Sequence, residues 1–304
     1  MPEITTLTLN PAYDVHVNID TFTIHRENTA DSVSRDIGGK GINISRALNE
    51  NKIANTAILI LGNDNSGDFK SGVKKEGLDC KIIECDGRIR ENITVHPSDG
   101  KETRLSFKGF SCDASLLCDV EKLIPDGGIV TFTGSLPEGI TAEDAEVFLV
   151  RLKERGVKLV IDSKSVTLEM LRRIKPWLIK PNSEEIEAYF GGKMSEDELY
   201  KKALELGNDG IENVMISLGG DGAILANGGE IYRAYVPKID VRSTIGAGDS
   251  SIAGFICADG DSETRLKTAV SYGSAACLRE GTNPPLGADI EKIYSNVRIE
   301  KINF

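Results

Sequence analysis

The chain has 304 residues, of which 40% are hydrophobic and 27% charged, a composition typical of a soluble globular protein. Its formal net charge of −11 argues against nucleic acid or an anionic membrane surface as a partner. No secretory signal pattern follows the opening Met-Pro-Glu, and the six cysteines lack the C-x-x-C spacing of zinc sites. We therefore expect a cytoplasmic protein with reduced thiols and no membrane contact.

Short apolar runs typical of buried parallel strands recur along the chain. They cover Ile4–Leu9, Ala57–Leu61, Ile129–Thr133, Lys158–Ile161, Trp177–Lys180 and Asn213–Ser217. Amphipathic segments lie between them, and the clearest begins at the capping-box pair Thr141 and Asp144 and ends before Gly156. Repeated β-α-β units predict an α/β fold in which helices flank both faces of a mostly parallel central sheet.

Two stretches interrupt this rhythm, at about 12–36 and 88–110. Both are polar and rich in β-branched residues, and the second contains a hairpin signal at Asp99-Gly100. We expect them to form a small β-sheet lid over the site of a single domain spanning residues 1–304.

Two glycine clusters carry the chemistry. Gly246-Ala247-Gly248-Asp249 opens an apolar helical segment, where backbone N–H groups and the helix dipole favour an anion. Asp249 in the first turn suits a general base acting on a hydroxyl group. Gly38–Asn43 opens another helix, and Asn43 offers a donor and an acceptor to sugar hydroxyls. Each cluster alone is about equally consistent with an ordinary helix cap.

Together these clusters resemble the two signature patterns of the PfkB (ribokinase-like) carbohydrate kinase family. The resemblance keeps the family's motif order over nearly the whole chain and includes the T-L-N-P-x-x-D opening of the phosphosugar branch. The matching segments are Thr8–Asp14, Gly38–Leu48, Gly134–Pro137, Lys180–Glu185, Ser217–Gly222 and Thr244–Asp249. Asp162-Ser163-Lys164-Ser165 departs from the more usual D-T-S-G, and whether Lys164 faces the site stays open.

The resemblance implies a ribokinase-like fold and transfer of a phosphoryl group from ATP with Mg²⁺. Asp249 would deprotonate the acceptor hydroxyl, and Gly246, Ala247 and Gly248 would form the anion hole. Asn182 and Glu185 would hold Mg²⁺ through water, and the less favoured alternative for these two positions is a helix cap and a solvated acid. The implied ATP-binding residues are Lys180, Asn182, Ser217, Gly219, Gly220, Asp221, Gly222, Gly248, Ser274 and Asn283.

The implied substrate is a small phosphosugar. Asp14 and Asn43 would hold its hydroxyls, and Lys40, Arg90 and Arg104 its phosphate, although either arginine would also suit a solvated strand position. The full set of implied substrate-binding residues is Asp14, Gly38, Gly39, Lys40, Asn43, Arg90, Arg104 and Ser135.

The favoured reaction is phosphorylation of fructose 1-phosphate to fructose 1,6-bisphosphate, and tagatose 6-phosphate is the nearest alternative substrate. A non-catalytic sugar or nucleotide sensor on the same fold is a second possibility, which retention of Asp249 disfavours. A dinucleotide-dependent oxidoreductase is disfavoured because no G-x-G-x-x-G follows the first strand. The family also suggests a homodimer through the lid.

Overall fold

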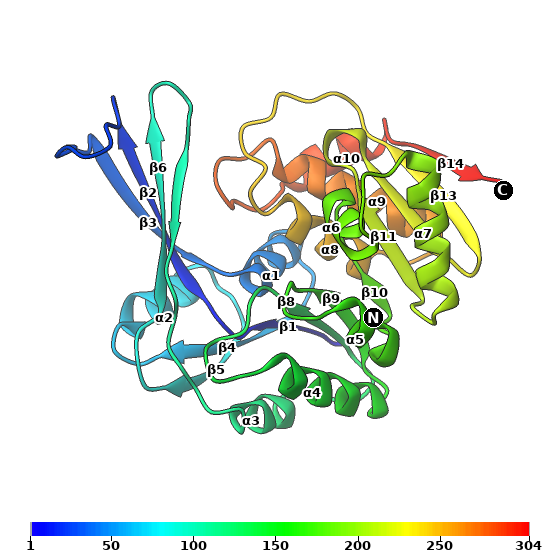
Figure 1. Ribbon diagram of the computed structural model, residues 1–304, viewed down its shortest axis with the longest axis horizontal. Helices are drawn as coiled ribbons and strands as arrows, with labels where there is room; N and C mark the ends of the chain where they lie inside the picture. The colour runs from blue at the N-terminus through cyan, green and yellow to red at the C-terminus, as the bar shows by residue number, and fades with distance from the viewer. Residues whose placement is uncertain (1, 304) are drawn as a thin grey trace.

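The computed structural model describes residues 2–303, which form a ten-stranded sheet, a four-stranded sheet and the helices that cover them (Figure 1). The strands of the large sheet run in the order β14-β13-β12-β11-β10-β9-β8-β1-β4-β5. Neighbours from β5 to β11 pair in parallel, and β11 to β14 pair antiparallel. This confirms the predicted α/β class.

The bounds of the large-sheet strands follow the apolar runs of the sequence. They are β1 (Ile4–Thr8), β4 (Thr56–Gly62), β5 (Cys80–Cys85), β8 (Ile129–Thr133), β9 (Lys158–Asp162), β10 (Leu178–Ile179), β11 (Asn213–Ser217), β12 (Ala223–Asn227), β13 (Glu230–Tyr235) and β14 (Arg298–Ile302). The run at Trp177–Lys180 is only a two-residue strand, because the chain leaves the sheet at the buried Lys180.

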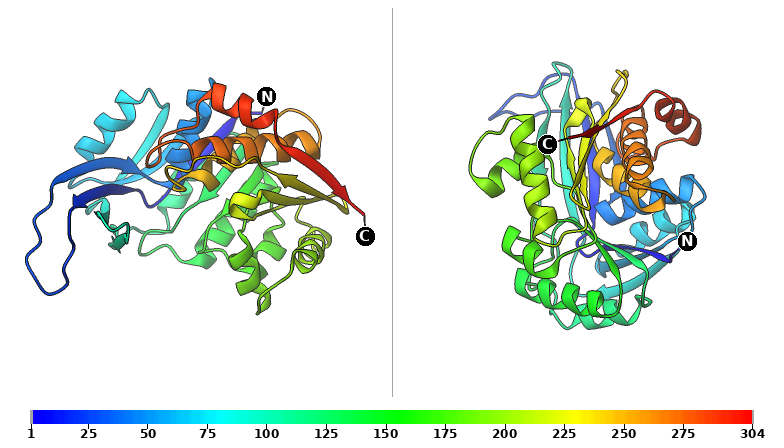
Figure 2. Two further views of the ribbon diagram at one scale, coloured as in Figure 1. Left: turned by 90° about the horizontal axis from the view of Figure 1, so that it is seen from above. Right: turned by 90° about the vertical axis from the view of Figure 1, so that its right-hand side faces the viewer.

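Helices cover both faces of the large sheet, as expected for parallel strands that are apolar on both sides (Figure 2). The first face carries α1 (Lys40–Glu50), α2 (Ser66–Lys75), α8 (Ala247–Cys257), α9 (Ser262–Ala276) and α10 (Gly287–Tyr294). The second carries α3 (Leu116–Lys122), α4 (Ala142–Glu154), α5 (Leu168–Ile174), α6 (Ser183–Phe190) and α7 (Glu196–Asn208). A 3₁₀ turn, Gly219–Asp221, joins β11 to β12. The capping box predicted at Thr141 and Asp144 starts α4.

The small sheet stands out from the core, with strand order β3-β2-β6-β7 (Figure 1). Its strands are β2 (Ala12–Ile19), β3 (Ser32–Gly38), β6 (Arg90–Pro97) and β7 (Thr103–Ser106), and a turn at Gly100 joins the last two. The face that carries Asp14 is polar, because residues two apart share a face of a strand and the register aligns Asp36, Asp14 and Asn92. We call this the inner face of the lid, and the sequence predicted both of its segments.

No helix within residues 2–303 is long and apolar enough to cross a membrane.

Candidate active site

Asp249 lies in the first turn of α8, where the core meets the lid. Gly246 is the N-cap residue and has a φ of 77°, a left-handed conformation that glycine adopts without strain. Asp249 is only 6% exposed, and its Oδ2 accepts a 2.9 Å hydrogen bond from the Asn43 side chain of α1. The two glycine clusters therefore meet in space, although 206 residues separate Asn43 from Asp249.

The first turn of α8 is open to an anion. No side chain caps the helix, and the first amides of a helix have no acceptor within it. A Cβ built on Gly248 would lie 3.0 Å from the Lys180 ammonium, so glycine gives this cation access to the helix end. The amides of Gly246, Ala247 and Gly248 are the donors predicted for the anion hole. Of these three, the Ala247 amide already donates a 3.3 Å hydrogen bond to the Thr244 carbonyl.

Two lysines share the carboxylate of Asp162, at the carboxyl end of β9. The Lys40 ammonium lies 2.9 Å and the Lys180 ammonium 3.6 Å from the same Oδ2. Asp162 and Lys180 are each only 8% exposed, so solvent screens this ion triad weakly. Its net positive charge lies beside Asp249 and the open end of α8.

This charge distribution sets the protonation of both carboxylates. Burial raises the pKa of Asp249 to about 6, against the opposing effects of Lys40 and the Asn43 hydrogen bond. Burial also acts to raise the pKa of Asp162, but Lys180 and Lys40 outweigh it and hold this pKa below its usual range. Near neutral pH, Asp249 is therefore an ionised base close to its pKa, as efficient general base catalysis requires.

Asp14 of β2 marks the lid side of the site. Its Oδ1 accepts a 3.0 Å hydrogen bond from the Asn92 side chain and lies 3.9 Å from the Arg104 guanidinium. A Cβ on Gly38 would lie 2.2 Å from the Asp14 Oδ2, which explains the glycine there. Arg104, whose side chain is 54% exposed, thus reaches across the inner face of the lid toward Asp14.

Buried polar atoms without a partner cluster between the lid and the core. Arg90 donates a 3.3 Å hydrogen bond to the Asn10 carbonyl, and Asn10 donates one of 3.2 Å to the Ser135 hydroxyl. Within the described residues, the Arg90 Nε, Asn10 Oδ1 and Asn92 Oδ1 have no hydrogen-bond partner. Because unpaired buried polar atoms are costly, this arrangement suits a polar ligand such as a sugar phosphate.

A cavity of about 480 Å³ lies on the other side of α8. Predicted nucleotide residues line one wall, and apolar side chains that include Val236, Ile239 and Val270 provide a surface suited to a flat base. The predicted residues on its lining are Lys180, Ser217, Gly219, Gly220, Gly222, Gly248 and Ser274.

Three residues of the predicted nucleotide set are not on the lining of this cavity, and one of them, Asn182, lines a neighbouring pocket beside Asp162. Asp221 lies in the 3₁₀ turn before Gly222, where its carbonyl accepts a hydrogen bond from Arg233. Asn283 follows α9 and lines a different cavity, beneath the lid, because its loop turns back toward α1. The geometry thus separates Asn283 from the expected base pocket.

Asn182 and Glu185 form a capping box at the start of α6. The Asn182 side chain accepts a 2.7 Å hydrogen bond from the Glu185 amide, and the Glu185 Oε2 accepts one of 3.0 Å from the Asn182 amide. Both residues line a pocket with Asp162 and Lys180, as does the exposed Lys164. No group of three or more metal-ligand side chains occurs within residues 2–303. The Asn182 and Glu185 oxygens are of the kind that Mg²⁺ prefers, directly or through its waters, and the Glu185 Oε1 has no hydrogen-bond partner among residues 2–303.

The sequence analysis missed Asp162, Asn10 and Asn92 as site residues. Asp162 ends a buried strand and Asn10 lies two residues after one, at the edge where ligands bind in such sheets, a signal that would have found them. Asn92 lies in Arg90-Glu91-Asn92, which resembles the family's R-x-N pattern, but its contact with Asp14 depends on the lid register.

Known proteins resemble this chain in both sequence and fold. Residues 8–288 match the model of the pfkB family of carbohydrate kinases. The chain is 34% identical to 1-phosphofructokinase of Borreliella burgdorferi over 98% of this chain and 99% of that protein. It is 34% identical to 1-phosphofructokinase of Haemophilus influenzae over 84% of each chain. Phosphofructokinase-2 from Escherichia coli in complex with fructose-6-phosphate superposes with a TM-score of 0.90 at 26% identity, covering 97% of this chain and 99% of that one.

Proposed function

Because the chain belongs to the pfkB family of carbohydrate kinases, we propose that it transfers the γ-phosphoryl group of ATP to fructose 1-phosphate, giving fructose 1,6-bisphosphate. The single observation that carries this proposal is the buried Asp249 at the open end of α8, between a phosphosugar-like site and a nucleotide-like cavity. The relatives named 1-phosphofructokinase support the choice of sugar.

In the proposed mechanism, Asp249 accepts the proton of the substrate's free primary hydroxyl as that oxygen attacks the γ-phosphorus. The bond from the γ-phosphorus to the bridging oxygen of the β-phosphate breaks, and ADP leaves. The first-turn amides of α8 and the Lys180 ammonium stabilise the charge on the transferring group. Catalysis of this kind depends mainly on positioning and charge, which the rigid helix end and the ion triad supply.

Lys40 has a different proposed role from the one expected. Its ammonium is held 2.9 Å from Asp162, and Asp249 and Asp162 together raise its pKa against the lowering effect of burial. We therefore assign it to keeping Asp249 ionised, and we assign the substrate's phosphate to Arg90 and Arg104. Mg²⁺, held through water by Asn182 and Glu185, would neutralise the phosphates of ATP.

We also propose that the protein forms a homodimer through the outer face of the lid. That face exposes Val33 (61%), Leu105 (51%) and Phe107 (50%), which alternate with the polar residues of the inner face. Exposed apolar side chains gathered on one sheet face mark an interaction surface.

The test of the proposed reaction is a substrate panel at fixed ATP and Mg²⁺, read as ADP release with phosphorus NMR of the product. We expect the highest kcat/KM with fructose 1-phosphate, ahead of tagatose 6-phosphate, fructose 6-phosphate and fructose. A higher value with tagatose 6-phosphate would leave the mechanism and replace the sugar. Absence of turnover with every sugar would reject the kinase proposal in favour of a non-catalytic sensor.

A further inference from the structure

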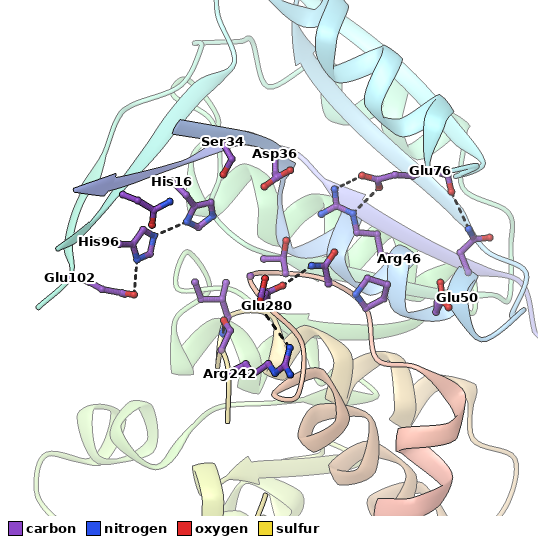
Figure 3. A pocket seen from close by; sticks show the side chains of 18 of the residues that line it. His16, Ser34, Asp36, Arg46, Glu50, Glu76, His96, Glu102, Arg242 and Glu280 are labelled. Atoms are coloured by element: carbon purple, nitrogen blue, oxygen red, sulfur yellow. Dashed lines mark hydrogen bonds and ion pairs between the residues drawn. The ribbon is translucent and has the colours of Figure 1, made fainter. Parts of the chain in front are cut away.

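Three titratable side chains form a hydrogen-bonded chain on the inner face of the lid (Figure 3). The His16 Nδ1 lies 2.9 Å from the His96 Nε2, and the His96 Nδ1 lies 2.9 Å from the Glu102 Oε1. The two imidazole rings stack, with centroids 5.2 Å apart. We call these residues the lid relay, and the mechanism above does not use them.

The order of partners in the lid relay fixes its tautomers. A carboxylate only accepts, so the Glu102 oxygen takes a hydrogen bond from the His96 Nδ1–H. The neutral His96 Nε2 is then an acceptor and takes the His16 Nδ1–H. The His16 Nε2 is left as an acceptor, and it has no hydrogen-bond partner within residues 2–303. One added proton turns this nitrogen into a charged N–H donor.

The lid relay begins next to the sugar side of the site. His16 is two residues after Asp14 on the same face of β2, which corresponds to about 7 Å of strand. On that face, Thr94 of β6 pairs with both His16 and Arg104. A sugar whose hydroxyls contact Asp14 therefore has Arg104 and His16 as the nearest cationic groups farther out on the lid.

Most other charges facing this space are already paired. Figure 3 shows the lid relay on one wall of a cavity of about 740 Å³, with Arg242 and Glu280 of the facing loops on the other. Arg242 lies 3.8 Å from Glu280, and Arg46 of α1 lies 2.7 Å from Glu76. The cavity also contains two acids, Asp36 and Glu50, that have no ion pair within the described chain. A phosphate entering here needs added positive charge, which a protonated His16 provides.

We propose that the lid relay is a proton-linked recognition site for the phosphate already on the sugar substrate. The added proton lies on the His16 Nε2, which donates to the phosphate, and His96 and Glu102 are positioning residues that fix the tautomer of His16. The inference rests on the proposed phosphosugar kinase function and deepens its substrate recognition. Affinity for the phosphosugar then weakens as the pH rises and the relay loses its proton.

The test measures the dissociation constant of fructose 1-phosphate by calorimetry between pH 6 and pH 8.5, in chains that all carry Asp249→Asn. That background removes the titration of Asp249, and the ionisation of the sugar phosphate is common to all variants. We expect His16→Gln to weaken binding about tenfold at pH 6, the usual effect of losing a charge-assisted hydrogen bond, and less than about twofold at pH 8.5. His16→Lys, which stays charged, should keep only the pH dependence that the ionisation of the sugar phosphate contributes.

The matched control is Asn18→Ala, a neutral change on the same face and cavity, which should leave the pH dependence of binding unchanged. The same pH dependence in His16→Gln as in its Asp249→Asn parent would overturn the inference and leave the kinase proposal intact. Failure of every variant to bind any phosphosugar, together with absent turnover in the unmodified chain, would overturn both.

Discussion

At the scale of the residue, the burial of Asp249 has opposite effects on the stability of the fold and on the basicity of the carboxylate. Its burial raises the pKa to about 6, so an ionised Asp249 near neutral pH costs folding free energy that a protonated one does not. The same burial makes the carboxylate a stronger base for proton transfer. Catalytic strength at this position is thus obtained at the expense of stability.

Asp249→Asn should stabilise the fold as well as abolish turnover. The raised pKa means that the favourable contribution is present below the unfolded pKa of about 4 and is lost as the pH rises through about 6. At pH 8 the neutral Asn variant should therefore gain up to about 3 kcal/mol in free energy of unfolding. Urea unfolding of both proteins at pH 5 and pH 8 measures this, and an equal difference at both pH values would contradict it.

Lys40 should set the pH at which activity appears. Removing its charge with Lys40→Met leaves Asp249 with less electrostatic support, so its pKa rises and the acid limb of kcat/KM moves to higher pH. We expect a loss of about tenfold or more at pH 7 that shrinks by pH 9. Lys164→Met is the control, because it removes a charge from an exposed lysine nearby. If the acid limb of kcat/KM lies at the same pH in Lys40→Met as in the unmodified chain, Lys40 does not keep Asp249 ionised.

At the scale of the element, the start of α6 combines a capping box with the two residues proposed to hold Mg²⁺. Its capping box is matched by the box of Ser195 and Glu198 at the start of α7, which lies outside the site pockets. Helix-end geometry alone therefore does not explain why Glu185 shares a pocket with Asp162 and Lys180.

Glu185→Gln should raise the Mg²⁺ concentration needed for half-maximal activity several-fold. The amide oxygen can still accept from the Asn182 amide, so we expect the free energy of unfolding to change by less than about 1 kcal/mol. Glu198→Gln makes the same change in the control box and should leave the Mg²⁺ dependence as it was. Equal Mg²⁺ curves for Glu185→Gln and the unmodified chain would show that Glu185 serves only as a cap.

Most elements around the site could be predicted from the sequence, since each begins or ends on a local signal. Asn213–Ser217 and the box at Thr141 are confirmed as predicted. The pairing of Lys40 with Asp162 could not be predicted from the sequence. It joins residues 122 positions apart, and their approach depends on how α1 packs on the sheet. The lid relay has the same origin, since the lid register pairs His16 with Thr94 and thereby places His96 diagonally across from His16.

At the scale of the whole molecule, the lid has two chemically different faces. Its inner face bears polar residues toward the site, whereas its outer face exposes apolar side chains at alternate positions. A sheet with this pattern needs one face covered by protein. The proposed dimer and the proposed substrate contacts would thus use opposite sides of the same strands.

Leu105→Glu with Phe107→Glu should yield a monomer. Burying two charges in an apolar interface is costly, so we expect the apparent mass in light scattering to fall to that of one 32.9 kDa chain. Thr103→Glu, on the same strand and the same outer face as Leu105, tests whether any added charge on this face is enough to dissociate the dimer. An unmodified chain that is already a monomer at micromolar concentration would contradict the proposed dimer.

The most direct test of the central claim is the turnover of Asp249→Asn with fructose 1-phosphate and Mg²⁺–ATP at pH 8, measured beside the dissociation constant of fructose 1-phosphate. Loss of the general base predicts a fall in kcat of about a thousandfold or more, with binding retained within about threefold. Turnover near that of the unmodified chain would contradict the assignment of Asp249 as the base that activates the sugar hydroxyl.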